Sequence, residues 1–129
     1  EHLEQKKWPY YDQLIKMIKQ NHPNLKIVIA PGPSEIEKAK KFDAVSILKE
    51  DKAISISELA GLIKKSRFVV SNDTGPAHMA AHMNVKGLSL FGSHTTAYKV
   101  SIERENFKVI QVSDLKNLSA EKVFERLVF

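Results

Sequence analysis

The amino-acid sequence predicts an α/β domain in which helices cover both faces of a parallel β-sheet. Short β-branched runs alternate with amphipathic helical stretches, turn residues separate them, and no internal repeat or low-complexity linker interrupts the alternation. Strands that alternate with helices form βαβ units, and such units build parallel sheets. The 129 residues suffice for one domain and are too few for two independent cores. We therefore expect one Rossmann-like unit over residues 1–129.

A helix opens the chain and a strand follows it. Four apolar residues have the i, i+3, i+4, i+7 spacing of one helix face: Tyr11, Leu14, Ile15 and Ile18. This spacing predicts a helix over about 9–21, which Pro23 terminates. The run 25–30 is β-branched and bounded by turn residues, so it predicts a buried strand.

The next two helices are marked by capping-box patterns. The serine–x–x–glutamate spacing of a capping box occurs at 34–37 and again at 55–58. It predicts a short helix to about residue 42 and a longer helix to about residue 65. The run 44–48 between them predicts a second strand.

The second half of the chain continues the alternation. Apolar runs predict strands at 67–71, 86–91 and 107–112. Helices are expected at 76–83, where a proline occupies the first turn, and from Ser119, a good helix cap, to about residue 128.

Composition excludes several classes of protein. The apolar share of 43% and the charged share of 27% are those of a globular protein, which excludes disorder and coiled coil. Because the chain has no cysteine, it has neither a disulfide framework nor a thiolate metal site, which is consistent with a reducing cytoplasm. The apolar runs are too short to span a bilayer. The net charge of +5 suits an anionic ligand and is too small and dispersed to predict nucleic-acid binding.

The turn after the third strand is the strongest candidate site. In an open parallel sheet, ligands bind beyond the carboxyl ends of the strands. Asp73 or Thr74 can cap the following helix, and Gly75 lets a ligand approach the backbone closely. The free N–H groups of the first helical turn would then face an anion, with His78 as a further donor. A purely structural turn and cap explains the same residues, so spacing alone leaves both interpretations open.

Two further features point less clearly to a ligand. Glu35 follows the turn after the first strand, where a carboxylate can accept hydrogen bonds from ribose hydroxyls. It also complements the helix dipole, and from the residues alone we favour that structural role. His78 and His82 have an i, i+4 spacing, but Met79 stands where a zinc motif has glutamate, so we expect no metal.

The sequence around this turn resembles a known family. The segment Arg67–Ala81 (RFVVSNDTGPAHMAA) resembles the signature of the heptosyltransferases, glycosyltransferase family 9, and the similarity continues through Leu88–Gly92. Upstream, Lys6–Pro9 (KKWP) resembles the family's Lys-x-Trp-Pro, and Ser55–Ala60 fits a further family segment loosely. The resemblance implies the C-terminal, donor-binding domain of a GT-B glycosyltransferase, whose two Rossmann-like domains enclose the active-site cleft.

The resemblance also implies a set of donor-binding residues: Lys6, Glu35, Ile54, Asp73, Thr74, Gly75 and His78. Lys6 would meet the phosphate side, Glu35 would lie near the nucleoside ribose, and the backbone of Ile54 would contact the base. The other four would line the diphosphate and the sugar. The family needs neither a metal nor another cofactor.

The activity implied is inverting, metal-independent transfer of a heptose-like sugar from a donor such as ADP-heptose to the lipopolysaccharide core or a related surface glycan. The catalytic base, an aspartate, and the glycolipid acceptor are expected on an N-terminal domain outside this chain, so this fragment alone would be inactive. We expect a cytoplasmic protein, compatible with peripheral association of the full-length protein at the inner face of the membrane.

Two departures from the family pattern leave alternatives open. Ser93–Thr96 (SHTT) stands where the family has Pro-Thr-Asp-Pro, and the threonines expected before Lys6 are not evident. Donor base and sugar therefore stay open. The alternatives are another GT-B enzyme, such as a UDP-sugar transferase or a sugar-nucleotide epimerase, and a non-catalytic α/β binding module.

Overall fold

Three parallel strands form the main sheet of the protein. The computed structural model describes residues 8–72, 75–92 and 103–129. The strand order is β5 (Val69–Asn72), β6 (Gly87–Phe91) and β7 (Phe107–Gln111), with β6 in the centre. All five residues of β6 are buried, as expected for a central strand covered on both faces.

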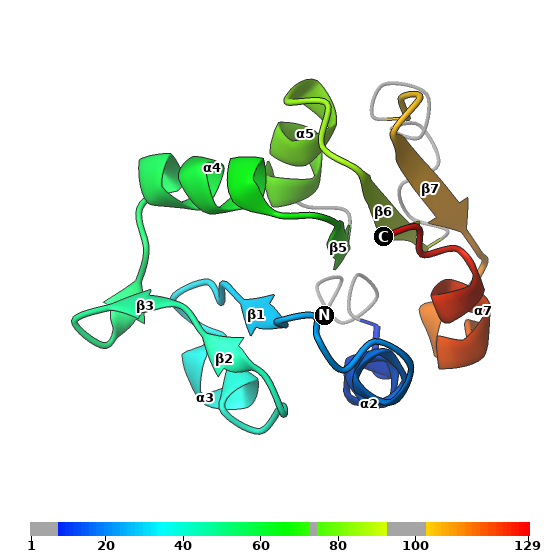
Figure 1. Ribbon diagram of the computed structural model, residues 1–129, viewed down its shortest axis with the longest axis horizontal. Helices are drawn as coiled ribbons and strands as arrows, with labels where there is room; N and C mark the ends of the chain where they lie inside the picture. Colours follow the sequence, from blue (N-terminus) through cyan, green and yellow to red (C-terminus); the bar gives the residue numbers. More distant parts are fainter. Residues whose placement is uncertain (1–7, 73–74, 93–102) are drawn as a thin grey trace.

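Four helices cover this sheet: α2 (Tyr11–Asn21), α4 (Ile56–Lys65), α5 (Gly75–His82) and α7 (Ala120–Glu125). Figure 1 shows α4 and α5 on one side of the strands and α2 on the other. The alternation of side chains along β6 explains this arrangement. Leu88 and Leu90 join the core cluster of α2 and α7, whereas Phe91 joins the cluster of α4 and α5. The predicted parallel sheet with helices on both faces is thereby confirmed.

The remaining strands are shorter than the sequence predicted. The parallel pair β1 (Val28–Ile29) and β2 (Val45–Ser46) forms a separate two-stranded ladder, so only two residues of the predicted strand 25–30 are paired. The predicted strand 44–48 is wrong in its second part. There the chain enters an antiparallel hairpin of β3 (Leu48–Lys49) and β4 (Lys52–Ala53).

The ends of three helices test the predicted capping patterns. The capping box of α4 is confirmed, because Ser55 Oγ accepts from the N–H of Glu58 at 3.1 Å and the N–H of Ser55 donates to Glu58 Oε1 at 2.8 Å. The predicted Ser34 cap of α3 (Ile36–Ala39) is wrong. The chain is still turning there, with the Glu35 N–H bonded to the Gly32 carbonyl, so Glu35 is the N-cap. Ser119 caps α7 as predicted.

Two helices end earlier in the structure than the sequence predicted. Helix α3 ends at Ala39 instead of about residue 42, and α7 ends at Glu125 instead of about residue 128. In both places the next residues form three-residue turns instead of continuing the helix: Phe42 bonds back to Ala39, and Leu127 to Phe124. These short bonds tighten the last turn and end the helical ladder. Between β7 and α7, the chain also forms a short 3₁₀ helix, η2 (Leu115–Asn117).

Candidate functional site

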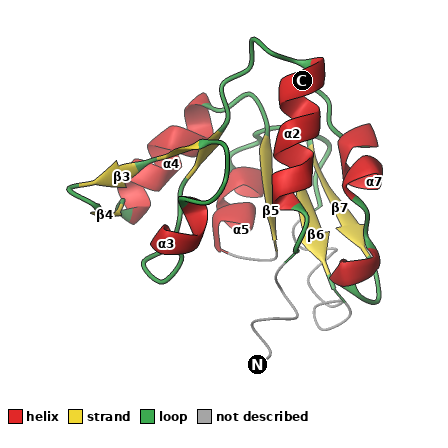
Figure 2. Ribbon diagram, turned by 90° about the horizontal axis from the view of Figure 1, so that it is seen from below, coloured by secondary structure: helices red, strands yellow, loops and turns green. Residues whose placement is uncertain are grey.

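The carboxyl ends of the main strands meet at one edge of the sheet. Because β5, β6 and β7 are parallel, they end side by side at Asn72, Phe91 and Gln111 (Figure 2). Helix α5 starts at Gly75, three residues after the end of β5. The end of β5 and the start of α5, which we call the corner, therefore lie at the edge where open parallel sheets bind ligands, and the two residues that link them lie outside the described residues.

Helix α5 lies close against the sheet. Ala77, Ala80 and Ala81 are 0%, 0% and 2% exposed, and they pack in the same cluster as Phe91 and Phe107. Their small side chains let the helix axis approach the strands. The first-turn N–H groups of an α-helix have no partner within the helix, and the dipole makes this end positive.

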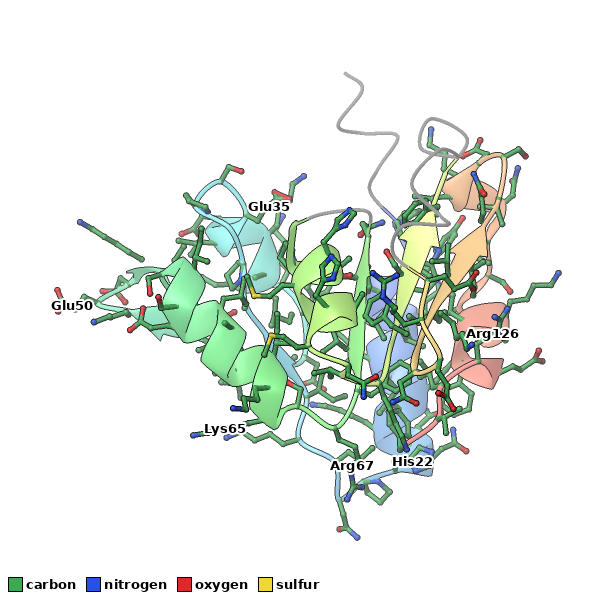
Figure 3. All side chains as sticks on the ribbon, turned by 90° about the horizontal axis from the view of Figure 1, so that it is seen from above. His22, Glu35, Glu50, Lys65, Arg67 and Arg126 are labelled. Atoms are coloured by element: carbon green, nitrogen blue, oxygen red, sulfur yellow. The ribbon has the colours of Figure 1, made fainter. Side chains whose placement is uncertain are left out.

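Of the predicted site residues, three lie toward the carboxyl edge of the sheet: Gly75, His78 and Glu35. Gly75 is the first residue of α5, and His78 is half-buried in its first turn. Glu35 is the half-buried N-cap of α3. Figure 3 shows Glu35 at the end of the molecule opposite Arg67, which precedes β5 and marks the amino-terminal edge of the sheet. Glu35 and α5's first turn therefore both lie toward the carboxyl edge.

Ile54 is placed apart from the corner. It is half-buried between β4 and the capping box of α4, at the end of α4 that lies beside the hairpin in Figure 1. Lys6, Asp73 and Thr74 lie outside the described residues. The structure consequently shows the end of β5, the start of α5 and the position of His78. The binding roles assigned to the seven residues stay predictions.

Asn72, the last residue of β5, is fixed from two directions. The hydroxyl of Tyr11 on α2 donates a hydrogen bond of 2.8 Å to Asn72 Oδ1. Ser89, fully buried on β6, donates from Oγ to the Asn72 carbonyl at 3.1 Å. Burial raises the pKa of Tyr11 well above its usual range, so the hydroxyl keeps its proton. The chain thus leaves β5 for the corner from an anchored residue.

Two polar atoms at the same edge lack hydrogen-bond partners among the described residues. They are Ser71 Oγ near the end of β5 and Gln111 Nε2 at the end of β7, and both atoms are buried. By strand alternation from Val69 and Val109, both side chains belong to the sheet face that α4 and α5 cover. Unpaired buried polar atoms are rare in native proteins, and a catalytic role or a bound ion or water is among the reasons for them. Ser71 and Gln111 place two polar groups at the carboxyl edge of a layer whose core cluster is apolar.

The comparisons with known proteins agree with this geometry. The family model described as glycosyltransferase family 9 (heptosyltransferase) matches residues 1–127, almost the whole chain. The chain belongs to glycosyltransferase family 9. The resemblance inferred from the corner sequence is thereby confirmed.

Individual relatives of this family 9 chain are heptosyltransferases. Lipopolysaccharide heptosyltransferase 1 of Campylobacter coli is 29% identical over 100 residues, which are 70% of this chain and 29% of that protein. The E. coli heptosyltransferase WaaC with ADP matches with a TM-score of 0.80 and 25% identity, over 95% of this chain and 39% of WaaC. E. coli ADP-heptose lps heptosyltransferase II, at 18% identity and a TM-score of 0.72, supports the fold alone.

The family 9 chain therefore spans well under half the length of these relatives. The match to part of WaaC, a GT-B enzyme, confirms the predicted fold class. A second structure of WaaC, with ADP-2-deoxy-2-fluoro heptose, matches with a TM-score of 0.77 and the same 25% identity.

Two further features of the described part of this family 9 domain concern metal ions and membranes. No three His, Cys, Asp or Glu side chains there are grouped so that they could hold a metal ion. His82 Nδ1 lies 3.5 Å from Arg104 Nη2, a contact that disfavours metal binding at this ring nitrogen. A bilayer-crossing helix needs about 20 apolar residues, and none of the described helices meets that requirement.

The described residues also form a small open hollow that contains none of the predicted site residues. It has a volume of about 150 Å³ and lies between the start of α2 and the start of α7. Its lining consists of Tyr10, Gln13, Lys116, Asn117, Ser119 and Ala120. It is far smaller than the clefts that hold drug-sized ligands. The corner at α5 therefore remains the candidate site.

Sequence reasoning missed Tyr11 and Ser89 as supports of this corner. Tyr11 counted as one member of an apolar helix stripe, and its partner Asn72 is 61 residues away. Ser89 offered a signal, because a serine between two leucines of a fully buried strand needs a hydrogen-bond partner. Periodicity identifies buried positions but does not identify the groups that they meet.

Proposed function

We propose that this chain is the donor-binding domain of an inverting, metal-independent glycosyltransferase, which transfers a heptose-like sugar from a nucleoside diphosphate to lipopolysaccharide core or a related surface glycan. The observation that carries the proposal is the start of α5 three residues beyond β5, at the carboxyl edge of a parallel sheet. Family 9 membership and the similarity to the ADP-containing structure of WaaC support the nucleotide as ligand.

The corner would stabilise the leaving group of the reaction. The acceptor oxygen attacks the anomeric carbon, and the bond from this carbon to the phosphate oxygen breaks. The electron pair stays on the nucleoside diphosphate, so negative charge grows on the terminal phosphate. Preorganised N–H donors at a helix start are worth most where such charge develops. Gly75 and His78 would supply donors from α5, with Asp73 and Thr74 shaping the turn and Lys6 adding a positive charge.

The remaining roles follow the family pattern. Glu35 would accept hydrogen bonds from the ribose hydroxyls, and the backbone of Ile54 would contact the base. The acceptor hydroxyl would lose its proton to an aspartate on an N-terminal domain outside this chain. Because the acceptor would be a glycolipid, we propose that the full-length protein works in the cytoplasm at the inner face of the membrane.

A nucleotide titration of the 129-residue chain tests the proposal. Titration with ADP and with UDP, followed by backbone amide shifts, should perturb Gly75, Ala77 and His78, with ADP favoured. A stronger response to UDP would favour a UDP-dependent transferase or an epimerase. No response to either nucleotide at millimolar concentration would contradict the proposal and favour a non-catalytic module.

Two histidines on one helix provide a matched pair of variants. His78→Ala should weaken ADP binding roughly 10- to 100-fold, because a hydrogen bond to a charged group contributes about 1.5–3 kcal/mol. His82→Ala should leave it unchanged, since His82 is exposed at the far end of α5. Equal affinity of the two variants would remove His78 from the site.

A further inference from the structure

We propose that Tyr11 is a positioning residue for the nucleoside-diphosphate corner: its hydroxyl fixes Asn72 and so sets where the first turn of α5 begins. The proposal rests on the proposed function, because it concerns the same corner. Tyr11 lies on α2, on the sheet face opposite α5, and belongs to no motif of the corner.

Asn72 is the last described residue before the corner. Its side chain and its backbone are held by different elements, since Tyr11 bonds the side-chain oxygen and Ser89 bonds the carbonyl oxygen. Two bonds to one residue from α2 and from β6 restrict both its rotation and its translation. Only two residues separate Asn72 from Gly75, so we expect a shift of Asn72 to displace the N–H groups of the first turn of α5.

The Tyr11 side chain is itself held in one orientation. Its ring packs edge-on against Trp8, with ring centroids 4.9 Å apart. The Trp8 indole N–H is in turn bonded to the Leu118 carbonyl at 2.7 Å. Because the Tyr11 hydroxyl is buried and keeps its proton, it remains a donor toward the Asn72 oxygen at every physiological pH.

This arrangement connects the corner to the opening segment of the chain. Trp8 stands two positions after Lys6, which the proposed function assigns to the phosphate side. Trp8 and Tyr11 therefore join the beginning of α2 to the end of β5 through one ring contact and one hydrogen bond.

The alternative is that Tyr11 merely stabilises the fold, and the neighbouring Tyr10 offers a control for it. The Tyr10 hydroxyl also donates a hydrogen bond of 2.8 Å, but to the Lys116 carbonyl in η2. Tyr10→Phe and Tyr11→Phe each remove one hydroxyl and one bond of equal length. Only the Tyr11 bond leads to the end of β5, so nucleotide affinity distinguishes a positioning role from a general one.

The experiment compares both variants of the 129-residue chain with the wild type, at a temperature where all are folded. Tyr11→Phe should weaken ADP binding by up to roughly 5-fold, which corresponds to the full contribution of one hydrogen bond, and shift the amide signals of Gly75–His78 without ligand. Tyr10→Phe should do neither. Combining Tyr11→Phe with Asn72→Ala should weaken binding no more than Asn72→Ala alone, because the hydroxyl acts through Asn72.

The outcomes separate this inference from the proposed function. If the wild type binds ADP and Tyr11→Phe binds it as tightly as Tyr10→Phe, the positioning role is wrong while the proposed function stands. Additive losses in the double variant would likewise overturn it. If Tyr11→Phe does not fold, Asn72→Ala must show the affinity loss and amide shifts by itself. A wild type that binds neither ADP nor UDP would overturn both proposals.

Discussion

The indole Nε1 of Trp8 donates a hydrogen bond of 2.7 Å to the carbonyl oxygen of Leu118, which is 110 residues away along the chain. Trp8 is 3% exposed and Leu118 is 2% exposed, so water cannot replace this bond. Both residues belong to the core cluster that α2 and α7 form on the sheet. The contact therefore connects the beginning of the described chain to the segment that precedes its last helix.

Replacing Trp8 should reveal the strength of this connection. Trp8→Phe keeps an aromatic ring but leaves the Leu118 carbonyl buried without its donor, which costs about 1–3 kcal/mol of unfolding free energy. Tyr10→Phe is the control, because it removes a bond of similar length in an exposed setting and should cost less. Urea denaturation measures both variants. Equal losses would show that the burial of the Trp8 bond contributes nothing extra.

The two serines with capping-box spacing should behave differently. Ser55→Ala removes the oxygen that accepts from the Glu58 N–H, and the loss of such a cap costs about 0.5–2 kcal/mol. Ser34→Ala should leave the unfolding free energy almost unchanged, since α3 has Glu35 as N-cap and no side-chain cap bond. Chemical denaturation of the pair is the measurement. A loss at Ser34 as large as that at Ser55 would contradict the structure.

The carboxylate of the same capping box makes stability depend on pH. The backbone N–H of Ser55, followed by the side chains of Ser55 and Lys49, holds the pKa of Glu58 below its ordinary value of 4.5. A depressed pKa in the folded state means that the contribution is present above pH 4.5 and is lost as the pH falls through the folded value. Acidification should therefore weaken the start of α4.

Glu58→Gln isolates this effect, because glutamine can still accept the Ser55 N–H but carries no charge. Urea midpoints measured from neutral pH down through the acidic range should show a wild-type advantage that shrinks as the pH falls. Parallel curves for the wild type and Glu58→Gln over the whole range would show that the charge of Glu58 adds nothing.

Sequence reasoning predicted the elements whose signals are local. The α4 capping box depends on two residues three positions apart, and the strand 86–91 is a short, largely apolar stretch, so both could be identified without tertiary structure. The β3–β4 hairpin was missed because its turn contains Glu50 and Asp51 with φ of 52° and 66°. Neither is the glycine or asparagine that usually marks positive φ in a hairpin.

For the candidate site, too, the sequence predicted the local segment but not its tertiary contacts. The segment 67–81 carried the resemblance to glycosyltransferase family 9, and the family match over residues 1–127 confirms it. The anchoring of Asn72 was not readable, because it depends on Tyr11 from a helix 61 residues earlier. The spacing of residues within one segment predicts a turn. The residues that hold this turn in place lie far away in the sequence, and only the fold brings them next to it.

Two glycines should respond to alanine with opposite signs. Gly87 pairs with Val69 and Phe107 in one row across the sheet, and the Phe107 ring covers the space where a side chain would stand. A Cβ at Gly87 would lie 2.7 Å from both Phe107 Cδ2 and the Val69 carbonyl oxygen. Overpacking of this kind costs about 1–3 kcal/mol. The ladder fixes the Val69 oxygen, so little relaxation is available.

Gly61 is the matched control, since it is exposed in the middle of α4 and a Cβ added there would have no described atom within 4 Å. Gly61→Ala should stabilise the protein by about 0.5–1 kcal/mol, because glycine loses more backbone freedom than alanine in a helix interior. Urea denaturation of both variants gives the comparison. A Gly87→Ala midpoint that rises together with that of Gly61→Ala would mean that the Phe107 ring can move away from Gly87, and that the tight row across β5, β6 and β7 is not rigid.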